Sequence, residues 1–147
     1  MEKLFIYYSY TGNGEIVANV FKEQGYELRK ANPRKSLPKS FFFAILKGGF
    51  LAGIRHKSKL VDFNTDISNY DSIVIGSPIW NGRFSSPINT VLEAVDFNNK
   101  DLSFVFYSGS GTAAKAVKRI QKEFPNAKFI ILKEPKKYPE ELKKLVF

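Results

Sequence analysis

Cysteine is absent from this chain of 147 residues, and histidine, methionine and tryptophan each occur once. The absence of cysteine excludes disulfides, thiolate nucleophiles and cysteine-ligated iron–sulfur clusters, and with them the cysteine phosphatases. The single histidine, His56, stands between Arg55 and Lys57, where we expect a solvated side chain rather than a metal ligand or a general base. The composition therefore gives little support to metal or hydrolytic chemistry.

Long apolar segments are also absent. The longest uninterrupted apolar run, Phe41 to Leu46, has six residues, whereas a membrane-spanning helix needs about 20. The N-terminus enters a strand pattern within a few residues and shows no basic, apolar and cleavage-site succession, so we expect no secretory signal. These observations predict a cytoplasmic protein whose residues 1–147 form a single domain.

Acidic residues are absent from residues 28–61, although this segment is rich in cations. The cations are Arg29, Lys30, Arg34, Lys35, Lys39, Lys47, Arg55, Lys57 and Lys59. Elsewhere 14 Lys and Arg residues balance 14 Asp and Glu residues, so this segment carries the whole formal net charge of +9. About forty residues separate the second predicted strand from the third, more than a plain crossover needs, which indicates a long basic insertion. Pro38 is expected to open a helix inside it.

Near the N-terminus an apolar run passes directly into a loop of hydroxyls, glycine and asparagine. Residues 3–8 have the pattern of a buried parallel strand, and residues 13–24 have the apolar spacing of an amphipathic helix. The loop thus lies at a helix N-terminus, where unpaired backbone N–H groups and the helix dipole favour an anion. Its predicted ligand-binding residues are Ser9, Tyr10, Thr11, Gly12, Asn13 and Gly14. This loop can therefore bind a phosphate without any lysine.

Two further predicted strands, at residues 72–77 and 102–107, also end in loops of small residues. In an open α/β sheet, ligands bind outside the carboxyl ends of the strands, so we expect all three loops to converge on one ligand. The predicted ligand-binding residues of the second and third loops are Pro78, Ile79, Trp80, Asn81, Gly82, Ser108, Gly109, Ser110 and Gly111.

Alternation of apolar strands with helical segments predicts an α/β fold with a parallel sheet covered on both faces. Five such strands fit a doubly wound sheet of order 2-1-3-4-5, with the ligand at the switch point between the first and third strands. The strands are expected near residues 3–8, 26–30, 72–77, 102–107 and 127–132. The helices are expected near residues 13–24, 86–95, 112–123 and 138–146.

The first loop does not match the common nucleotide-binding motifs. Val17 stands where a dinucleotide fingerprint has its third glycine, and no G-x-x-x-x-G-K-[ST] sequence occurs, which disfavours a Rossmann NAD site and a P-loop NTPase. The pattern Ser9-x-Thr11-Gly12-Asn13 instead resembles the phosphate loop of the flavodoxin family, which holds the terminal phosphate of FMN. Residues 76–82, Gly-Ser-Pro-Ile-Trp-x-Gly, are similar to the second loop of short, flavodoxin-like members. The resemblance implies a flavodoxin-like fold with FMN as the cofactor.

Flavodoxins are electron carriers, so the resemblance implies an FMN-binding protein that acts in electron transfer. Two alternatives stay open: an FMN-dependent NAD(P)H or quinone reductase, and a binding module that has the fold without redox activity. The carrier is favoured, but the reductase stays open because residues 72–92 contain no acid and include Arg83, and a cation near the flavin would favour its anionic reduced form. No residue is predicted to be catalytic, because flavin chemistry needs no acid or base from the protein.

Two residues of the second loop have specific expectations. Trp80 occupies a position similar to the aromatic residue that stacks on the isoalloxazine in many flavodoxins; alternatively, it is a core residue beneath the loop. Asn81 stands where flavodoxins often have a glycine whose peptide flips on reduction. Asparagine tolerates positive φ better than most residues, so this flip would be hindered rather than forbidden.

The basic insertion, spanning residues 29–59, has three interpretations. In the first, it replaces a crossover helix and its lysine side chains are exposed to solvent. In the second, it is a docking surface for an acidic redox partner. In the third, it contacts an anionic membrane surface. Nucleic acid is the least favoured partner, because no recognised binding motif accompanies the charge.

Overall fold

The computed structural model describes residues 2–35 and 59–147. His56, the helix expected at Pro38 and most of the basic insertion lie outside the described residues. The strands are β1 (Lys3–Tyr7), β2 (Glu27–Lys30), β3 (Ser72–Trp80), β4 (Arg83–Phe84), β5 (Asp101–Ser108) and β6 (Lys128–Lys133). The helices are α1 (Asn13–Glu23), α3 (Ser86–Ala94), α4 (Ala114–Glu123) and the 3₁₀ helix η1 (Pro139–Lys144).

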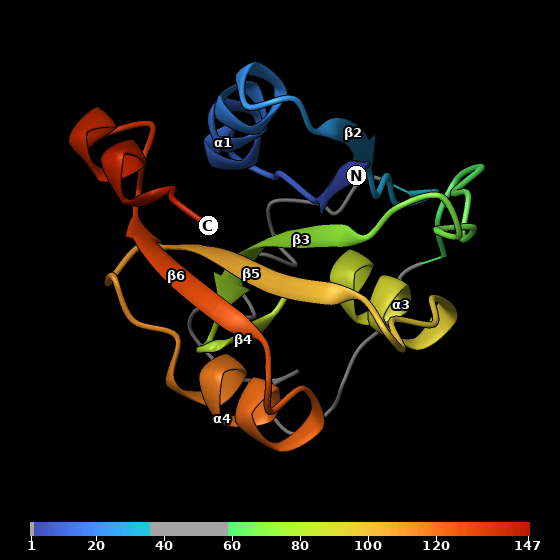
Figure 1. Ribbon diagram of the computed structural model, residues 1–147. Coiled ribbons are helices and arrows are strands. Elements are labelled where there is room, and N and C mark those ends of the chain that lie inside the picture. The colour runs from blue at the N-terminus through green and yellow to red at the C-terminus, as the bar shows by residue number, and fades with distance from the viewer. Residues whose placement is uncertain (1, 36–58) are drawn as a thin grey trace.

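The sheet has the strand order β2-β1-β3-β5-β6, and all four of these pairings are parallel (Figure 1). The short strand β4 lies off this path and pairs antiparallel with the end of β3. Because β5 and β6 are the fourth and fifth long strands, the predicted order 2-1-3-4-5 is confirmed. The topological switch point lies between β1 and β3, as predicted for this doubly wound α/β fold.

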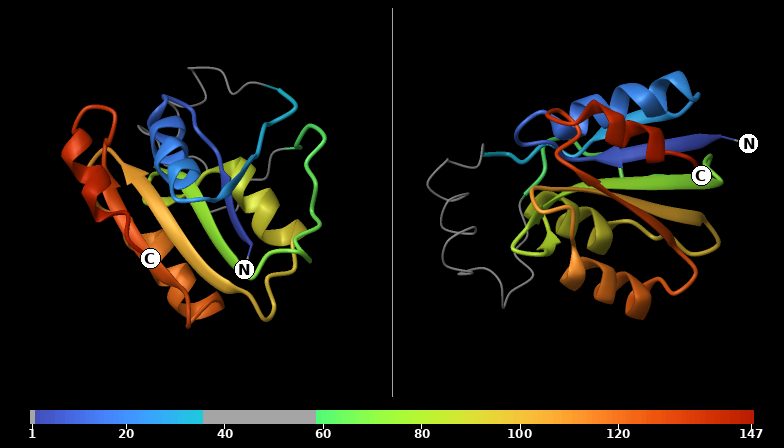
Figure 2. Two further views of the ribbon diagram at one scale, coloured as in Figure 1. Left: turned by 45° about the horizontal axis from the view of Figure 1, so that its top comes forward. Right: turned by 90° about the vertical axis from the view of Figure 1, so that its left-hand side faces the viewer.

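Two apolar cores cover the two faces of the sheet, and alternate residues of each strand supply them. Leu4 and Ile6 of β1 join the core that includes Ile88 of α3 and Ile120 of α4, whereas Phe5 joins the core under α1. Figure 2 shows α1 and η1 on one side of the sheet, with α3 and α4 on the other. Strands buried on both faces need continuous apolar sequence, which explains why the presence of these strands was predictable.

The third strand is three residues longer than predicted. Ile79 and Trp80 remain in β3, where they pair with Phe84 and Arg83 of β4. The connection is a two-residue hairpin in which Asn81 (φ 50°) and Gly82 (φ 74°) both have positive φ. An Asn-Gly pair favours this type I′ turn, because its twist matches that of the two strands.

The C-terminal segment forms a 3₁₀ helix rather than the predicted helix at 138–146. Leu145 belongs to the core under α1, and Leu142, three residues earlier, is partly buried against that core. A 3₁₀ helix has three residues per turn and therefore places such a pair on one side. The side-chain amide of Gln24 donates to the Leu145 carbonyl at 3.1 Å, which fixes this end of the chain against α1.

The described ends of the insertion pair with each other. Pro33 and Leu60 form an antiparallel bridge, flanked by hydrogen bonds from Arg34 N to Lys59 O (2.6 Å) and from Val61 N to Asn32 O (2.9 Å). Among the residues that the structure describes, no helix is long and apolar enough to span a membrane.

Candidate functional site

The first loop, residues 9–14, turns sharply from β1 into α1. Gly12 has a left-handed φ of 98° and precedes the first residue of the helix, Asn13. The Gly14 amide donates to Ser9 Oγ at 3.1 Å, and the Ile16 amide donates to the Gly12 carbonyl at 3.3 Å. The first turn of a helix leaves amides that its own carbonyls cannot satisfy, so this loop has the geometry of an anion site.

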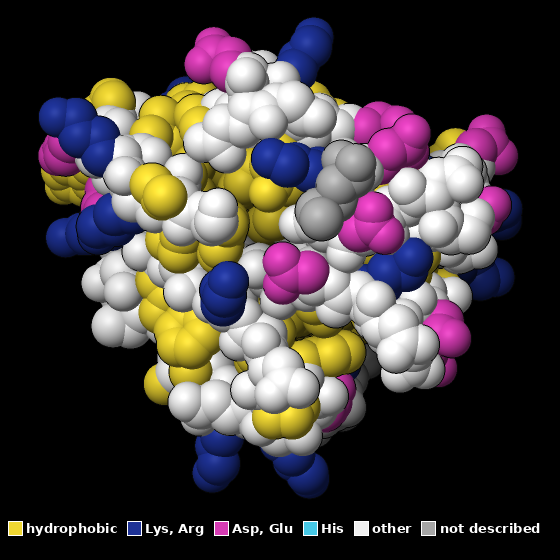
Figure 3. Space-filling view, viewed as in Figure 1, with side chains coloured by type: hydrophobic (Ala, Val, Ile, Leu, Met, Phe, Trp, Pro, Cys, Tyr) yellow, Lys and Arg dark blue, Asp and Glu magenta, His cyan; other side chains and the backbone are white. Residues whose placement is uncertain are grey.

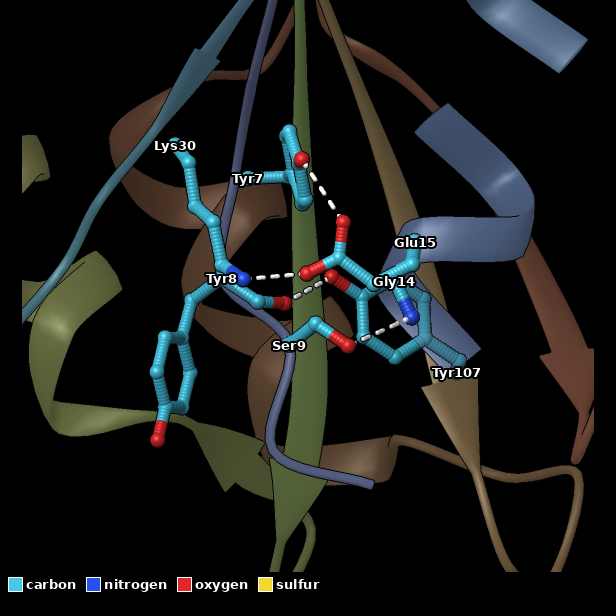
Figure 4. Close-up of polar contacts among 7 residues, drawn as sticks. All are labelled: Tyr7, Tyr8, Ser9, Gly14, Glu15, Lys30 and Tyr107. Atoms are coloured by element: carbon cyan, nitrogen blue, oxygen red, sulfur yellow. Dashed lines mark hydrogen bonds and ion pairs between the residues drawn. The ribbon is translucent and has the colours of Figure 1, made fainter. Parts of the chain in front are cut away.

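The loop is pressed closely against the sheet at Gly14. A Cβ on Gly14 would lie 2.7 Å from Ser9 Cβ, 2.8 Å from the Tyr107 hydroxyl and 2.8 Å from the Tyr8 carbonyl oxygen. The Tyr107 hydroxyl donates to that same carbonyl (Figure 4). Only glycine fits at this position without displacing the backbone of the loop.

A carboxylate in the first turn of α1 is neutralised locally. The Tyr7 hydroxyl donates to Glu15 Oε2 at 2.9 Å, and Lys30 of β2 forms an ion pair with Glu15 Oε1 (Figure 4). Burial, together with this hydrogen bond and the Glu15 charge, raises the pKa of Tyr7 to about 12. Burial likewise raises the pKa of Tyr8 to about 12 and that of Tyr107 well above its ordinary value. These phenols therefore stay protonated at neutral pH.

The three predicted loops meet around one cavity with a volume of about 670 Å³. This volume lies within the range of small-molecule and cofactor sites, roughly 300–1,000 Å³. The first loop, the end of β3 and the loop after β5 each contribute to its walls. The lining residues are Tyr10, Thr11, Asn13, Pro78, Ile79, Trp80, Tyr107, Gly109, Glu134, Lys136 and Lys137.

Seven of the predicted ligand-binding residues thus line this cavity, and the other eight support or adjoin its walls. In the second loop, Asn81 and Gly82 form the hairpin turn, and the Gly82 carbonyl accepts a hydrogen bond from the Ala116 amide of α4 at 2.8 Å. In the third loop, Ser108 Oγ donates to the Thr112 carbonyl at 2.7 Å, and the Ser110 amide donates to Ser108 Oγ at 3.3 Å. The serine hydroxyl thus holds the loop in shape.

Trp80 lies in the core as well as in the cavity wall. It is only 5% exposed, and its ring meets those of Tyr8 and Tyr10 edge-on, at centroid distances of 5.9 and 6.3 Å. Such edge-to-face contacts are favourable aromatic geometries. Trp80 is therefore a core residue, as one of the two expectations had it. Its stacking on a flavin stays a prediction.

Sequence reasoning missed four lining residues: Tyr107, Glu134, Lys136 and Lys137. The two lysines bring cations to a cavity whose phosphate loop, by the sequence reasoning, needs no lysine. They follow β6, so their position after the carboxyl end of a fifth parallel strand was the available signal. The loop after β6, residues 134–138, has no glycine or serine, so its own sequence does not resemble the other three loops.

Two cations of the predicted insertion have partners inside the protein. Arg29 Nη1 donates to the carbonyls of Asn64 (2.9 Å) and Asp66 (2.8 Å), and Lys30 pairs with Glu15. The charge of Lys30 is therefore paired within the protein, whereas Arg29 keeps its charge and is held against residues 64–66.

The sequence profile of the flavodoxin family matches residues 53–144, more than half of the chain. The chain belongs to the flavodoxin family. No curated protein sequence matches it significantly. Because flavodoxins bind FMN, the predicted cofactor is confirmed at the level of the family.

Solved structures agree with this flavodoxin fold. A candidate flavoprotein of Bacteroides eggerthii superposes with a TM-score of 0.75 at 20% identity, covering 99% of each chain. A flavoprotein of Lactobacillus acidophilus, solved in complex with FMN, gives 0.68 at 21% identity, covering 95% of this chain and 97% of the other. An azoreductase of Bacillus anthracis gives 0.51 at 14% identity, covering 98% of this chain and 92% of the other. At these identities the likeness supports the fold alone.

The cavity fits a flavodoxin cofactor by its chemistry. Among its lining residues, Lys136 lies beside Thr11 and Asn13 at the first turn of α1, whereas the rings of Tyr10 and Trp80 meet each other at the end of β3. An elongated ligand with a phosphate at one end and an aromatic ring at the other meets suitable groups at both ends.

Proposed function

We propose that this flavodoxin-family protein binds FMN in the 670 Å³ cavity and carries electrons between other proteins. The observation that supports it is the convergence of the three loops on one cavity, with a phosphate-type loop at one end. When bound, FMN supplies the redox chemistry. The chain's own residues then bind the phosphate, orient the ring and exclude water.

The walls of the cavity support a carrier because they offer little for other chemistry. Among the described lining residues, Glu134 is the one carboxylate, and none is histidine or cysteine. The described residues contain no group of three or more side chains suited to hold a metal ion. The tyrosine phenols near the first loop have raised pKa values and remain protonated, so they serve as hydrogen-bond donors.

A reductase is the second candidate, and Arg83 favours it. Arg83 is the cross-strand neighbour of Trp80, a cavity residue, and its buried Nε has no hydrogen-bond partner among the described groups. A positive charge near the flavin would favour its anionic reduced form and thereby two-electron chemistry.

Steady-state oxidation of NAD(P)H by the FMN-loaded protein, with a quinone as acceptor, separates the two candidates. A carrier is expected to oxidise NAD(P)H no faster than the same concentration of free FMN, since it has no site for the nicotinamide. Saturable turnover with either nucleotide would contradict the carrier and favour the reductase. A protein that purifies and reconstitutes without flavin would contradict both.

We further propose that the redox partner is an acidic protein that docks on α4. Lys115, Lys118 and Lys122 are exposed and lie three and four residues apart, on one face of the helix. No described carboxylate forms an ion pair with them. Figure 1 places α4 at the lower edge of the molecule. Figure 3, viewed from the same side, shows lysine and arginine side chains that project from this edge.

This face adjoins the cavity. Lys115 packs over the hairpin turn, where its Cδ would lie 3.7 Å from a Cβ on Gly82, and the Ala116 amide binds the Gly82 carbonyl. A partner on α4 would therefore sit beside the second loop. Long-range attraction between the two proteins would be screened over about 8 Å at physiological salt.

Electron transfer with an acidic ferredoxin, followed by stopped-flow absorbance, tests this surface. The rate is expected to fall steeply as ionic strength rises, and the triple variant K115E/K118E/K122E should react several-fold more slowly at low salt. The matched control reverses Lys22, Lys128 and Lys143, which are exposed elsewhere. Equal rates in the two triple variants would refute docking on α4.

A further inference from the structure

The loop between β6 and η1, residues 134–138, reaches across to the first loop of the cavity. The Lys136 amide donates to Asn13 Oδ1 at 2.9 Å, and its ammonium donates to the Thr11 carbonyl at 3.4 Å. The same ammonium would lie 3.4 Å from a Cβ on Gly12. Lys136 thus lies directly over the turn that a phosphate would occupy.

This position is fixed by the backbone of residues 134–138. The Glu134 amide donates to the Ser108 carbonyl at 3.1 Å, which ties the start of the loop to the end of β5. The Glu134 carbonyl then accepts hydrogen bonds from the amides of Lys137 (2.8 Å) and Tyr138 (2.9 Å). Pro135 between them is buried. The turn is therefore closed on itself, and Lys136 stands at its tip.

The charge of Lys136 is available to a ligand. No described carboxylate forms an ion pair with it, and an ammonium has three N–H groups, of which the Thr11 carbonyl takes one. The carboxylate in the first turn of α1, that of Glu15, is already paired with Lys30. The N-terminus of α1 and the Lys136 ammonium thus present positive charge to the same end of the cavity.

We propose that Lys136 binds the phosphate of the flavin and makes the cavity selective for phosphorylated over unphosphorylated flavin. The inference rests on the proposed binding of FMN in this cavity. Helix amides and hydroxyls alone can hold a phosphate, but they leave its double negative charge without a counter-charge. A lysine supplies that charge as a mobile point cation, and N⁺–H···O⁻ hydrogen bonds are stronger than neutral ones.

Parallel fluorescence titrations of the apoprotein with FMN and with riboflavin test the proposal. Lys136→Met, which keeps the length of the side chain and removes its charge, should weaken FMN about tenfold and riboflavin less than twofold. It should also reduce the salt dependence of the FMN affinity, because one screened charge pair is lost. Lys136→Arg should restore most of the selectivity for FMN.

The matched control is Lys128→Met, at the opposite end of β6, which should leave both affinities unchanged. Circular dichroism shows whether each variant is folded. The ³¹P resonance of bound FMN gives a second readout, since loss of a neighbouring cation raises the second pKa of the phosphate. Equal effects of Lys136→Met on FMN and riboflavin, or none on either, would overturn the inference while FMN binding by the wild type upheld the proposed function. A wild type that binds no FMN would overturn both.

Discussion

Gly14→Ala is expected to weaken FMN binding by roughly two to four decades. The added Cβ would meet the Tyr8 carbonyl oxygen at 2.8 Å, and a backbone atom cannot rotate away as a side chain can. The chain at Tyr8 and Ser9 must therefore move away from α1. That movement breaks the hydrogen bond from the Gly14 amide to Ser9 Oγ and misaligns the donors that hold the phosphate.

The expected loss is large because several charge-assisted hydrogen bonds, each worth about 1.5–3 kcal/mol, share one loop geometry. Fluorescence titration with FMN measures it. Gly25→Ala is the matched control: Gly25 has a φ of 86° but nothing within 4 Å of an added Cβ. It should lower stability through backbone strain and leave FMN affinity unchanged. Unaltered FMN affinity in Gly14→Ala would show that the phosphate does not bind in the first loop.

Trp80→Ala is expected to lower the free energy of unfolding by about 3–5 kcal/mol, the usual range for removing a buried large aromatic side chain. The side chain is 5% exposed and belongs to the core on the α3 and α4 face. Its removal leaves a cavity beside Tyr8 and Tyr10, which lose their edge-to-face partner. Urea denaturation of the apoprotein, followed by circular dichroism, measures the change.

Trp80→Phe provides the control, because it keeps an aromatic ring and should cost much less stability. Flavin fluorescence in this variant also tests the stacking prediction. If Trp80 stacks on the isoalloxazine, the quenching of bound FMN should be partly relieved in Trp80→Phe. A stability loss below about 1 kcal/mol in Trp80→Ala would contradict its place in the core.

The sheet and its order were predictable from the sequence because the three central strands, β1, β3 and β5, are largely buried on both faces. A run such as Ile73, Val74 and Ile75 leaves no choice of exposed face, and all three side chains are fully buried. The three predicted loops followed from the same reasoning, since parallel strands place their carboxyl ends together. The local sequence was therefore sufficient to predict these strands and the three loops that follow them.

Features that depend on distant residues were not predictable in this way. Lys136 and Asn13 are bonded across 123 positions, and nothing near Lys136 in the sequence indicates a phosphate. The 3₁₀ form of η1 depends on the packing of Leu142 and Leu145 against α1, which local helix propensity does not contain. The extension of β3 does have a local signal, the Asn81-Gly82 pair of the hairpin turn, but the small residues before it are equally typical of a loop.

The central claim is that the cavity between the three loops holds FMN by its phosphate. Its most direct test is an equilibrium titration of the wild-type apoprotein with FMN and with riboflavin, side by side, by isothermal calorimetry. The account predicts one FMN per chain, bound at least about 100-fold more tightly than riboflavin, because the phosphate contributes several charge-assisted hydrogen bonds. Equal affinities for the two flavins, or binding of neither, would contradict it.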